Sequence, residues 1–97
     1  MVWAVELADE GVKAIDRLDN PTRQRIQQFI AQRLMNTDNP RQAGKALTGR
    51  YTGLWRYRIG GYRLVCRIED ARLVVLVVKL GHRRNVYQGS PPHETNP

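Results

Sequence analysis

The C-terminal half of the chain holds three short segments with strand periodicity, and two tight turns join them. The segments are residues 54–59, 62–68 and 73–80, and the turns are Gly60-Gly61 and residues 69–71. A pair of glycines and a short polar stretch are each typical of hairpin turns. Strands joined by such turns run antiparallel, so this half of the sequence predicts a three-stranded meander within one sheet.

The N-terminal half predicts one more strand and then two helices. Residues 2–7 alternate weakly and suit a first strand. A first helix should start at Asp9 and end near Asp19, with apolar side chains at helical spacing: Val12, Ile15 and Leu18. Asn20 capping a helix with Pro21 at its first position is a typical start, and a second apolar stripe follows: Ile26, Phe29, Ile30 and Leu34. We expect the two helices to form an antiparallel hairpin.

This order of elements predicts an α+β fold in a single domain of residues 1–87. The chain has 97 residues, which suits one hydrophobic core and not two. Residues 37–46 include Asp38, Asn39, Pro40 and Gly44 and indicate a connecting loop. Residues 88–97 have no apolar periodicity, so we expect a flexible C-terminal tail.

The sequence carries no signal for export or for a membrane. Its longest apolar run, residues 73–78, is too short to cross a bilayer, and its first residues lack the basic and apolar regions of a signal peptide. We therefore expect a cytoplasmic protein that does not bind membranes. The single cysteine, Cys66, excludes an internal disulfide, and its apolar neighbours predict that it is buried.

Positive charge is concentrated in the second part of the chain. The formal net charge is +7 at pH 7. Residues 1–40 have five lysines and arginines against six acidic residues, whereas residues 41–97 have eleven against three. This asymmetry favours a polyanionic partner, because arginine binds phosphate through its charge and its planar fork of donors. A solubilising surface is the alternative interpretation.

Strand register predicts where some of these charges meet. Period-two alternation places Arg56 and Arg58 on one face of their strand. If Gly60-Gly61 forms a two-residue turn, Arg58 lies directly opposite Arg63, and Arg56 lies diagonal to Arg63. Like charges opposite each other on neighbouring strands are unfavourable, and a bound phosphate would relieve their repulsion. The register therefore predicts a phosphate site.

The end of the last strand should bring further functional groups to this site. An antiparallel return places residues 79–80 near Tyr62, and Gly81 then frees the backbone to turn. The residues that follow would be delivered to the arginines: His82, Arg83, Arg84 and Tyr87. Arginines, an imidazole and a phenol can together bind a phosphate, stabilise transition-state charge and transfer protons.

Other chemistries have little support in the sequence. His82 and His93 have no carboxylate or thiolate cluster at metal-ligand spacing, and there is no glycine-rich nucleotide loop. The only serine, Ser90, lies in the expected tail, which argues against a Ser/His/Asp triad. We expect chemistry that uses neither a metal nor another cofactor.

Two segments resemble the RelE family of toxins, within the RelE/ParE superfamily of type II toxin–antitoxin systems. They are residues 54–65, LWRYRIGGYRLV, and residues 81–87, GHRRNVY. With the strand, helix hairpin and meander, the resemblance covers roughly residues 2–87. It implies helices packed on one sheet face. It also implies an mRNA endoribonuclease that inhibits translation, commonly by cutting in the ribosomal A site through attack of the ribose 2′-OH on the adjacent phosphate.

The resemblance also implies roles for individual residues. Arg56 and Arg58 match two basic strand residues that are often lysines. Arg63, Arg83 and Tyr87 match a phosphate-binding arginine, a transition-state arginine and a catalytic tyrosine. Arginine stays protonated, so neither strand arginine can easily replace a lysine base. His82 is our candidate for the general base, with Tyr87 as the alternative or as the leaving-group acid.

The expected partners are a cognate antitoxin, mRNA and the ribosome with its 16S rRNA. We expect the toxin alone to be a monomer and its antitoxin complex to be a hetero-oligomer. Candidate contacts to RNA or the ribosome are Arg41, Lys45, Arg50, Lys79 and Arg84, although solvated loops would explain several of them equally well. We interpret Trp55, Tyr57 and Tyr62 as packing residues rather than base-stacking platforms.

Two other functions are compatible with the same fold. A ParE-like inhibitor of DNA gyrase shares the architecture but acts by binding. A non-catalytic homologue would bind only its antitoxin or ribosomes. The set of arginines, histidine and tyrosine favours the nuclease.

Overall fold

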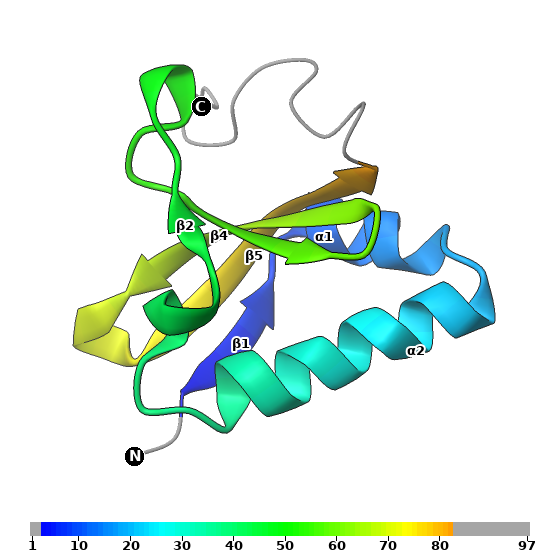
Figure 1. The fold of residues 1–97 in the computed structure, drawn as a ribbon, viewed down its shortest axis with the longest axis horizontal. Coiled ribbons are helices and arrows are strands. Elements are labelled where there is room, and N and C mark those ends of the chain that lie inside the picture. The colour runs from blue at the N-terminus through cyan, green and yellow to red at the C-terminus, as the bar shows by residue number, and fades with distance from the viewer. Residues whose placement is uncertain (1–2, 83–97) are drawn as a thin grey trace.

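The computed structural model describes residues 3–82 and has an α+β fold, as the sequence predicts. Two helices precede most of the sheet: α1 (Asp9–Asp16) and α2 (Asn20–Phe29). The strands lie in the order β1-β5-β4-β3-β2 (Figure 1). Their bounds are β1 Ala4–Leu7, β2 Lys45–Ala46, β3 Trp55–Ile59, β4 Tyr62–Glu69 and β5 Val74–His82. Short helical turns connect them: η1 Ile30–Met35, which is π-helical, and the 3₁₀ turns η2 Pro40–Ala43, η3 Gly49–Tyr51 and η4 Asp70–Arg72.

The meander of β3, β4 and β5 is confirmed, together with the two-residue turn at Gly60-Gly61. Ile59 lies opposite Tyr62 across this turn. Gly60 has φ of 60°, in the left-handed region that glycine adopts without strain. The first hairpin therefore has the register that the sequence argument required.

Two expectations about the strands are wrong. The loop expected at residues 37–46 ends in the short strand β2, which pairs with Trp55 and Arg56 at the edge of β3. The turn expected at Gly81 is absent, because β5 continues through Gly81 to His82 in register with Arg63 and Tyr62. Ladder pairing with β4 thus extends the last strand two residues beyond its apolar run.

The strand β1 lies parallel to β5, and the helix hairpin carries the chain from β1 at one border of the sheet to β2 at the other. Gly11 lets α1 approach closely, since a Cβ at this position would lie 3.0 Å from the carbonyl oxygen of Val77. Parallel pairing with β5 fixes one border of the sheet and leaves β3 and β2 at the other.

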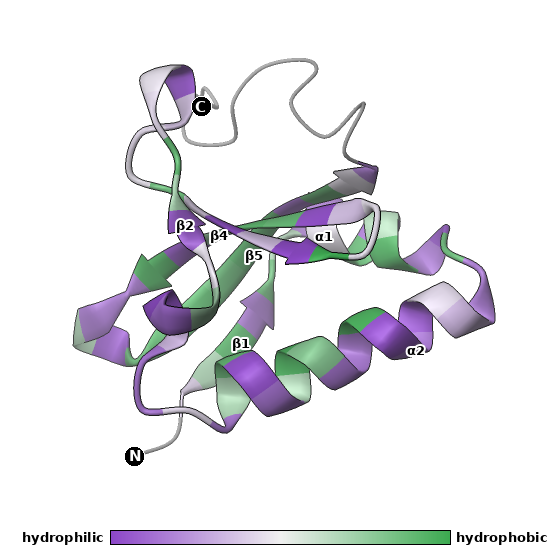
Figure 2. Cartoon of the chain, viewed as in Figure 1, coloured by the Kyte–Doolittle hydropathy of each residue, from purple (hydrophilic) through white to green (hydrophobic). Residues whose placement is uncertain are grey.

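The main core lies between the helices and one face of the sheet, which we call the helix face. Ile26 and Leu34 from the α2–η1 segment are fully buried against Tyr57, Leu64 and other strand residues. Hydrophobic and hydrophilic segments alternate along α2 (Figure 2), and Ile26 is its buried residue. Cys66 is buried in this core as expected.

A smaller apolar cluster covers part of the opposite face. It consists of Tyr51, Leu54, Val65 and Val78, with Leu47 packed against it. The arm of residues 47–54 between β2 and β3 supplies most of this cover. The remainder of that face is left for polar side chains.

The turn between α1 and α2 is held by the side chain of Arg23. Its guanidinium donates to the backbone oxygens of Ile15, Asp16 and Leu18 and to Oδ1 of Asn20. The residue capping α2 is Asp19, one position before the expected Asn20. No helix among residues 3–82 is long and apolar enough to cross a membrane.

Candidate functional site

Cationic side chains extend across four strands on the sheet face opposite the helices. Lys45 on β2 pairs with Arg56 on β3, Arg56 pairs with Val65 on β4, and Val65 pairs with Lys79 on β5. In the next row, Arg58 pairs with Arg63, which pairs with Gly81. Residues paired across a ladder share a face. We call this surface the cation face: Lys45, Arg56, Arg58, Arg63 and Lys79.

Two arginines of the cation face lie opposite each other, and some of the arginine nitrogens on this face are buried. Arg58 and Arg63 stand directly opposite each other, as predicted. Arg63 is only 9% exposed, and its Nη1 donates to the carbonyl oxygen of Tyr62 at 3.2 Å. Nε of Arg56 is buried and has no hydrogen-bond partner among the described residues. Buried donors are normally satisfied, so this face would be stabilised by an acceptor with negative charge.

A β-bulge places Lys79 on this face. Val65 pairs with Lys79 and Cys66 pairs with Val77, so Val78 is the extra residue of β5. Nζ of Lys79 lies 3.9 Å from a carboxylate oxygen of Glu10 on α1. This ion pair links the far border of the cation face to the helix hairpin.

A hollow of about 220 Å³ lies where β2 ends beside β3, and we call it the edge hollow. It is lined by three residues of the cation face, Lys45, Arg56 and Arg58, and by residues 42–44. Gly44 is required there, since a Cβ would overlap the carbonyl oxygen of Arg56. The hollow gives the cationic groups a concave surface that can partly enclose an anion.

His82 lies on the other side of the sheet from the arginines. It pairs in register with Tyr62, and the two rings meet edge to face with centroids 5.7 Å apart. Tyr62 packs against the core of the helix face, whereas its neighbour Arg63 belongs to the cation face. The end of β5 lies beside the strand that carries Arg63, as expected. The imidazole of His82 and the guanidiniums of the arginines nevertheless occupy opposite faces of the sheet.

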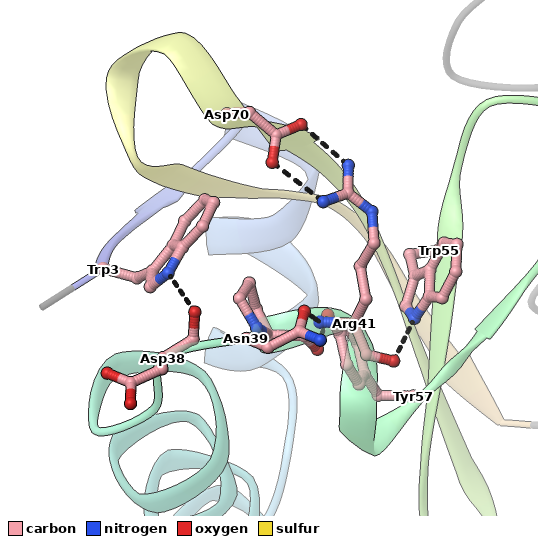
Figure 3. A network of polar contacts seen from close by, with 8 residues as sticks. Trp3, Asp38, Asn39, Arg41, Trp55, Tyr57 and Asp70 are labelled. Atoms are coloured by element: carbon pink, nitrogen blue, oxygen red, sulfur yellow. Dashed lines mark hydrogen bonds and ion pairs between the residues drawn. The ribbon is translucent and has the colours of Figure 1, made fainter. Parts of the chain in front are cut away.

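The loop before β2 is held to the helix face by three aromatic donors (Figure 3). The indole of Trp3 donates to the carbonyl oxygen of Asp38, and that of Trp55 donates to Arg41. The hydroxyl of Tyr57 donates to the carbonyl oxygen of Pro40 at 2.7 Å. Trp55 and Tyr57 therefore pack as predicted, and they also fix the segment that leads to Lys45.

Arg41 is engaged in the same region and lies outside the cation face. Both of its terminal nitrogens bind the carboxylate of Asp70 at 2.8 Å, and its guanidinium lies 5.7 Å from the ring centre of Trp55. The hydrogen bond from Arg41 lowers the pKa of Asp70, and the same bond raises the pKa of Arg41. The expectation that Arg41 contacts RNA therefore competes with an existing bidentate ion pair.

Two groups in the core are unsuited to proton transfer. Burial raises the pKa of the Tyr57 phenol. It also raises the pKa of the Cys66 thiol, which is more completely buried. Both groups stay neutral, which agrees with structural roles. Arg50, a predicted contact to RNA, is exposed on η3.

The remaining predicted site residues lie outside the described residues: Arg83, Arg84 and Tyr87. The same holds for His93, Ser90 and the expected tail, so these expectations stay predictions. In the part of the chain from residue 3 to 82, no three His, Cys, Asp or Glu residues gather in a group that could hold a metal ion.

Sequence reasoning missed the ion pair of Glu10 with Lys79 and the edge hollow. The run of apolar residues in β5 hides the bulge, because it has no alternation from which a register shift could be read. Gly44 was a visible signal for a close backbone approach, but its contact with β3 depends on a strand pair of two residues.

Comparison with known proteins identifies several toxins as similar. Residues 5–87 match the family described as the ParE toxin of the type II toxin–antitoxin system parDE. Toxin RelG of Mycobacterium tuberculosis is 35% identical over 49 residues, a stretch that covers 50% of this chain and 56% of the relative. The chain thus aligns with little more than half the length of this relative.

Solved structures share the fold. The toxin–antitoxin complex RelBE2 from Mycobacterium tuberculosis contains a chain that matches with a TM-score of 0.78 and 24% identity. The match covers 86% of this chain and 100% of that chain. The archaeal RelE–RelB complex from Pyrococcus horikoshii contains one with a TM-score of 0.67 and 26% identity, covering 89% of this chain and 100% of that one.

Proposed function

The chain belongs to the ParE toxin family, within the RelE/ParE superfamily of type II toxin–antitoxin toxins, and on this premise we propose that it is an mRNA endoribonuclease. It cuts RNA by attack of a ribose 2′-OH on the adjacent phosphate and thereby inhibits translation. The O2′–P bond forms, the P–O5′ bond breaks, and a proton moves from the 2′-oxygen to a base while the leaving oxygen gains one.

The cation face is the observation that carries this proposal. Arg56, Arg58 and Arg63 converge on one face, where neighbouring strands hold them in fixed positions. Rigid donors are well suited to a phosphate whose negative charge grows in the transition state, because they need not reorganise as the reaction proceeds. A role in solubility alone would not need two arginines in direct opposition on paired strands.

For the described residues the proposed roles follow from their positions on the sheet, and for Arg83 and Tyr87 they rest on the resemblance to the RelE family. Arg58 and Arg63 bind the scissile phosphate, and Lys45 and Lys79 bind phosphates on either side along the sheet. Arg83 and Tyr87 supply the transition-state cation and a proton-transfer group. Since the ring of His82 lies against Tyr62 on the helix face, Tyr87 becomes the first candidate for the general base.

A cognate antitoxin is the proposed protein partner. Both of the solved complexes named above contain a RelE-type toxin together with its antitoxin. The cation face suits an acidic segment of such an antitoxin, which would silence the toxin by covering the phosphate site. Dependence on the ribosome, contacts to 16S rRNA and a cytoplasmic location are parts of the same proposal.

Inhibition of DNA gyrase is the second candidate, and the family match to ParE toxins favours it. In that case the cation face would contact gyrase or its DNA without chemistry. Expression would cause DNA breaks and leave mRNA intact.

The deciding experiment incubates the purified protein with a defined mRNA, free and on translating ribosomes, and maps the cuts by primer extension. Arg58→Ala and Arg83→Ala are the test variants. Arg17→Ala, in the turn between α1 and α2, removes the same charge from an exposed site away from the cation face. We expect cuts by the unaltered protein and by Arg17→Ala, and a loss of about tenfold or more with Arg58→Ala.

The outcomes separate the candidate functions. Cuts that need ribosomes assign the protein to the ribosome-dependent nucleases. Absence of cuts in both settings overturns the nuclease, and inhibition of DNA supercoiling in a parallel gyrase assay would then support the second candidate. A cellular effect that survives Arg83→Ala points instead to a toxin homologue that acts by binding alone.

A further inference from the structure

A second hollow lies beside the edge hollow, between η1, which continues α2, and the loop before β2. Its volume is about 320 Å³, at the low end of the range of roughly 300–1,000 Å³ that is usual for small-ligand sites. We call it the amide hollow, because four of its seven lining residues carry side-chain amides: Gln32, Asn36, Asn39 and Gln42. Arg33, Thr37 and Ala43 complete the lining.

The polar groups of the amide hollow are available to a ligand. Asn39 uses Oδ1 to accept a hydrogen bond from the backbone of Arg41, which fixes the loop and leaves its amide nitrogen. Gln32, Asn36 and Gln42 are exposed and have no side-chain hydrogen bond with any residue from 3 to 82. Arg33 is likewise exposed and has no ion pair within that range.

The backbone that presents these amides is unusual. The segment η1 is π-helical, and π-helical turns are rare and occur frequently at functional sites. Gln32 and Arg33 belong to η1, and Asn36 caps it. The wider turn therefore ends the helix with three polar side chains on the rim of one hollow.

The two hollows adjoin each other. Gln42 and Ala43 line both of them. A polymer that enters the edge hollow, with its phosphates on Arg56 and Arg58, therefore reaches the amide hollow by passing over Gln42. Single-stranded RNA suits such a path, because its bases can be splayed out of a stack and read on their edges.

We propose that the amide hollow is a base-reading subsite, which binds one unpaired adenine of the single-stranded RNA whose phosphates occupy the cation face. This deepens the proposed function and rests on its assignment of RNA as the ligand. A side-chain amide offers a donor and an acceptor together, and this pair matches the N6 and N7 groups of adenine. Arg33 binds the phosphate that flanks this adenine.

Binding of uncleavable RNA tests the subsite separately from catalysis. The probes are fluorescein-labelled 2′-fluoro oligonucleotides of nine uridines, in which one position at a time is changed to A, C or G. Without a 2′-OH they cannot undergo the proposed reaction. We expect one position at which adenine tightens binding about fivefold or more over the other bases, as one bidentate amide–base pair provides.

Two pairs of variants make a matched comparison. The first pair is the double variant Gln32→Ala/Asn36→Ala, which removes two amides of the hollow. The second is the double variant Gln24→Ala/Gln28→Ala, which removes two exposed amides at the same spacing on α2. The first pair should lose the adenine preference and retain the affinity for plain oligouridine, whereas the second pair should keep both. Asn36→Asp keeps the size of the side chain, removes its donor and should also lose the preference.

The results distinguish this inference from the proposed function. An adenine preference that is absent from the unaltered protein, or that survives the first pair of variants, overturns the subsite. In the latter case the amides serve another purpose, such as binding extended peptide. A protein that fails to cut mRNA but shows the preference, lost only with the hollow amides, refutes the nuclease and retains the subsite.

Discussion

Single arginines in this protein have roles that their positions in the sequence do not reveal. Arg23 and Arg17 are both arginines of the helix hairpin, yet Arg23 alone donates to three backbone oxygens at the end of α1 and in the turn that follows. The last turn of a helix leaves carbonyl groups without helical partners, and Arg23 supplies donors there, although the carbonyl oxygen of Ile15 also accepts from the backbone N–H of Leu18 at 3.1 Å. The side chain of Arg23 thus closes α1 and fixes the turn into α2.

Replacement of Arg23 by alanine should therefore destabilise the fold. We expect a loss of about 1–3 kcal/mol in the free energy of unfolding, the usual cost of leaving such groups without their charged donor. Urea denaturation measures it. Arg17→Ala should change stability by about 0.5 kcal/mol or less, as is usual for exposed sites. Equal effects of the two variants would contradict this role of Arg23.

The ion pair of Arg41 and Asp70 should make stability depend on pH in the acid range. The pKa of Asp70 is lower in the folded than in the unfolded chain, chiefly through the hydrogen bond from Arg41. Its contribution is therefore full above the unfolded value, near pH 4, and is lost as the pH falls through the folded value. The Tm difference between the unaltered protein and Asp70→Asn should be largest at neutral pH and should vanish in strong acid.

Salt supplies the control for this prediction. The pair is exposed, so high salt at neutral pH should reduce the same Tm difference by screening. A Tm difference that grows toward acid pH would contradict the assignment to Asp70.

At the scale of elements, the loop of residues 37–44 depends on aromatic donors from distant strands. The carbonyl oxygen of buried Pro40 receives its hydrogen bond from Tyr57 on β3. Tyr57→Phe keeps the ring and removes this donor, so we expect a loss of about 1–3 kcal/mol in unfolding free energy. Tyr62→Phe, on the neighbouring strand, should have little effect. Urea denaturation of both variants compares the two hydroxyls, and similar losses would argue against the loop clamp.

The sequence predicted those elements whose signals are local. The Gly60-Gly61 turn and the alternation around it defined the β3–β4 register, and with it the pairing of Arg58 with Arg63. The strand β2 was not predicted because a strand of two residues shows no periodicity. Lys45 and Ala46 pair with β3 only once the loop before them is held against that strand. The position of His82 escaped it for a related reason, since Gly81 reads as a turn in sequence but takes part in the ladder with β4.

At the scale of the whole molecule, the two faces of the sheet differ in the side chains that they carry. The helix face buries most of the large apolar side chains, and the opposite face gathers cations over four strands. The bulge in β5 and the short pairing of β2 extend the cationic rows to both sides of the central arginines. We therefore expect that the proposed RNA binding and the stability of the fold can be altered by separate sets of substitutions.

This separation makes a prediction about the salt dependence of RNA binding. Each phosphate neutralised by a cation releases counterions, so the logarithm of the affinity for single-stranded RNA falls with the logarithm of salt concentration by about 0.7 per contact. Three to five contacts on the cation face should give a slope of about −2 to −4. Fluorescence anisotropy with a labelled oligouridine of 2′-fluoro RNA measures this slope.

Whether a single substitution changes this salt dependence should depend on whether the residue lies on the cation face. Arg58→Ala removes one exposed cation of the cation face and should make the slope shallower by about 0.7, with little change in stability. Arg17→Ala lowers the net charge by the same amount but lies in the helix hairpin, so its slope should equal that of the unaltered protein. If both variants changed the slope equally, RNA would be responding to net charge alone and the cation face would have no special part in binding. Distinct slopes would instead locate the phosphates on the strands that carry Arg58 and Arg63.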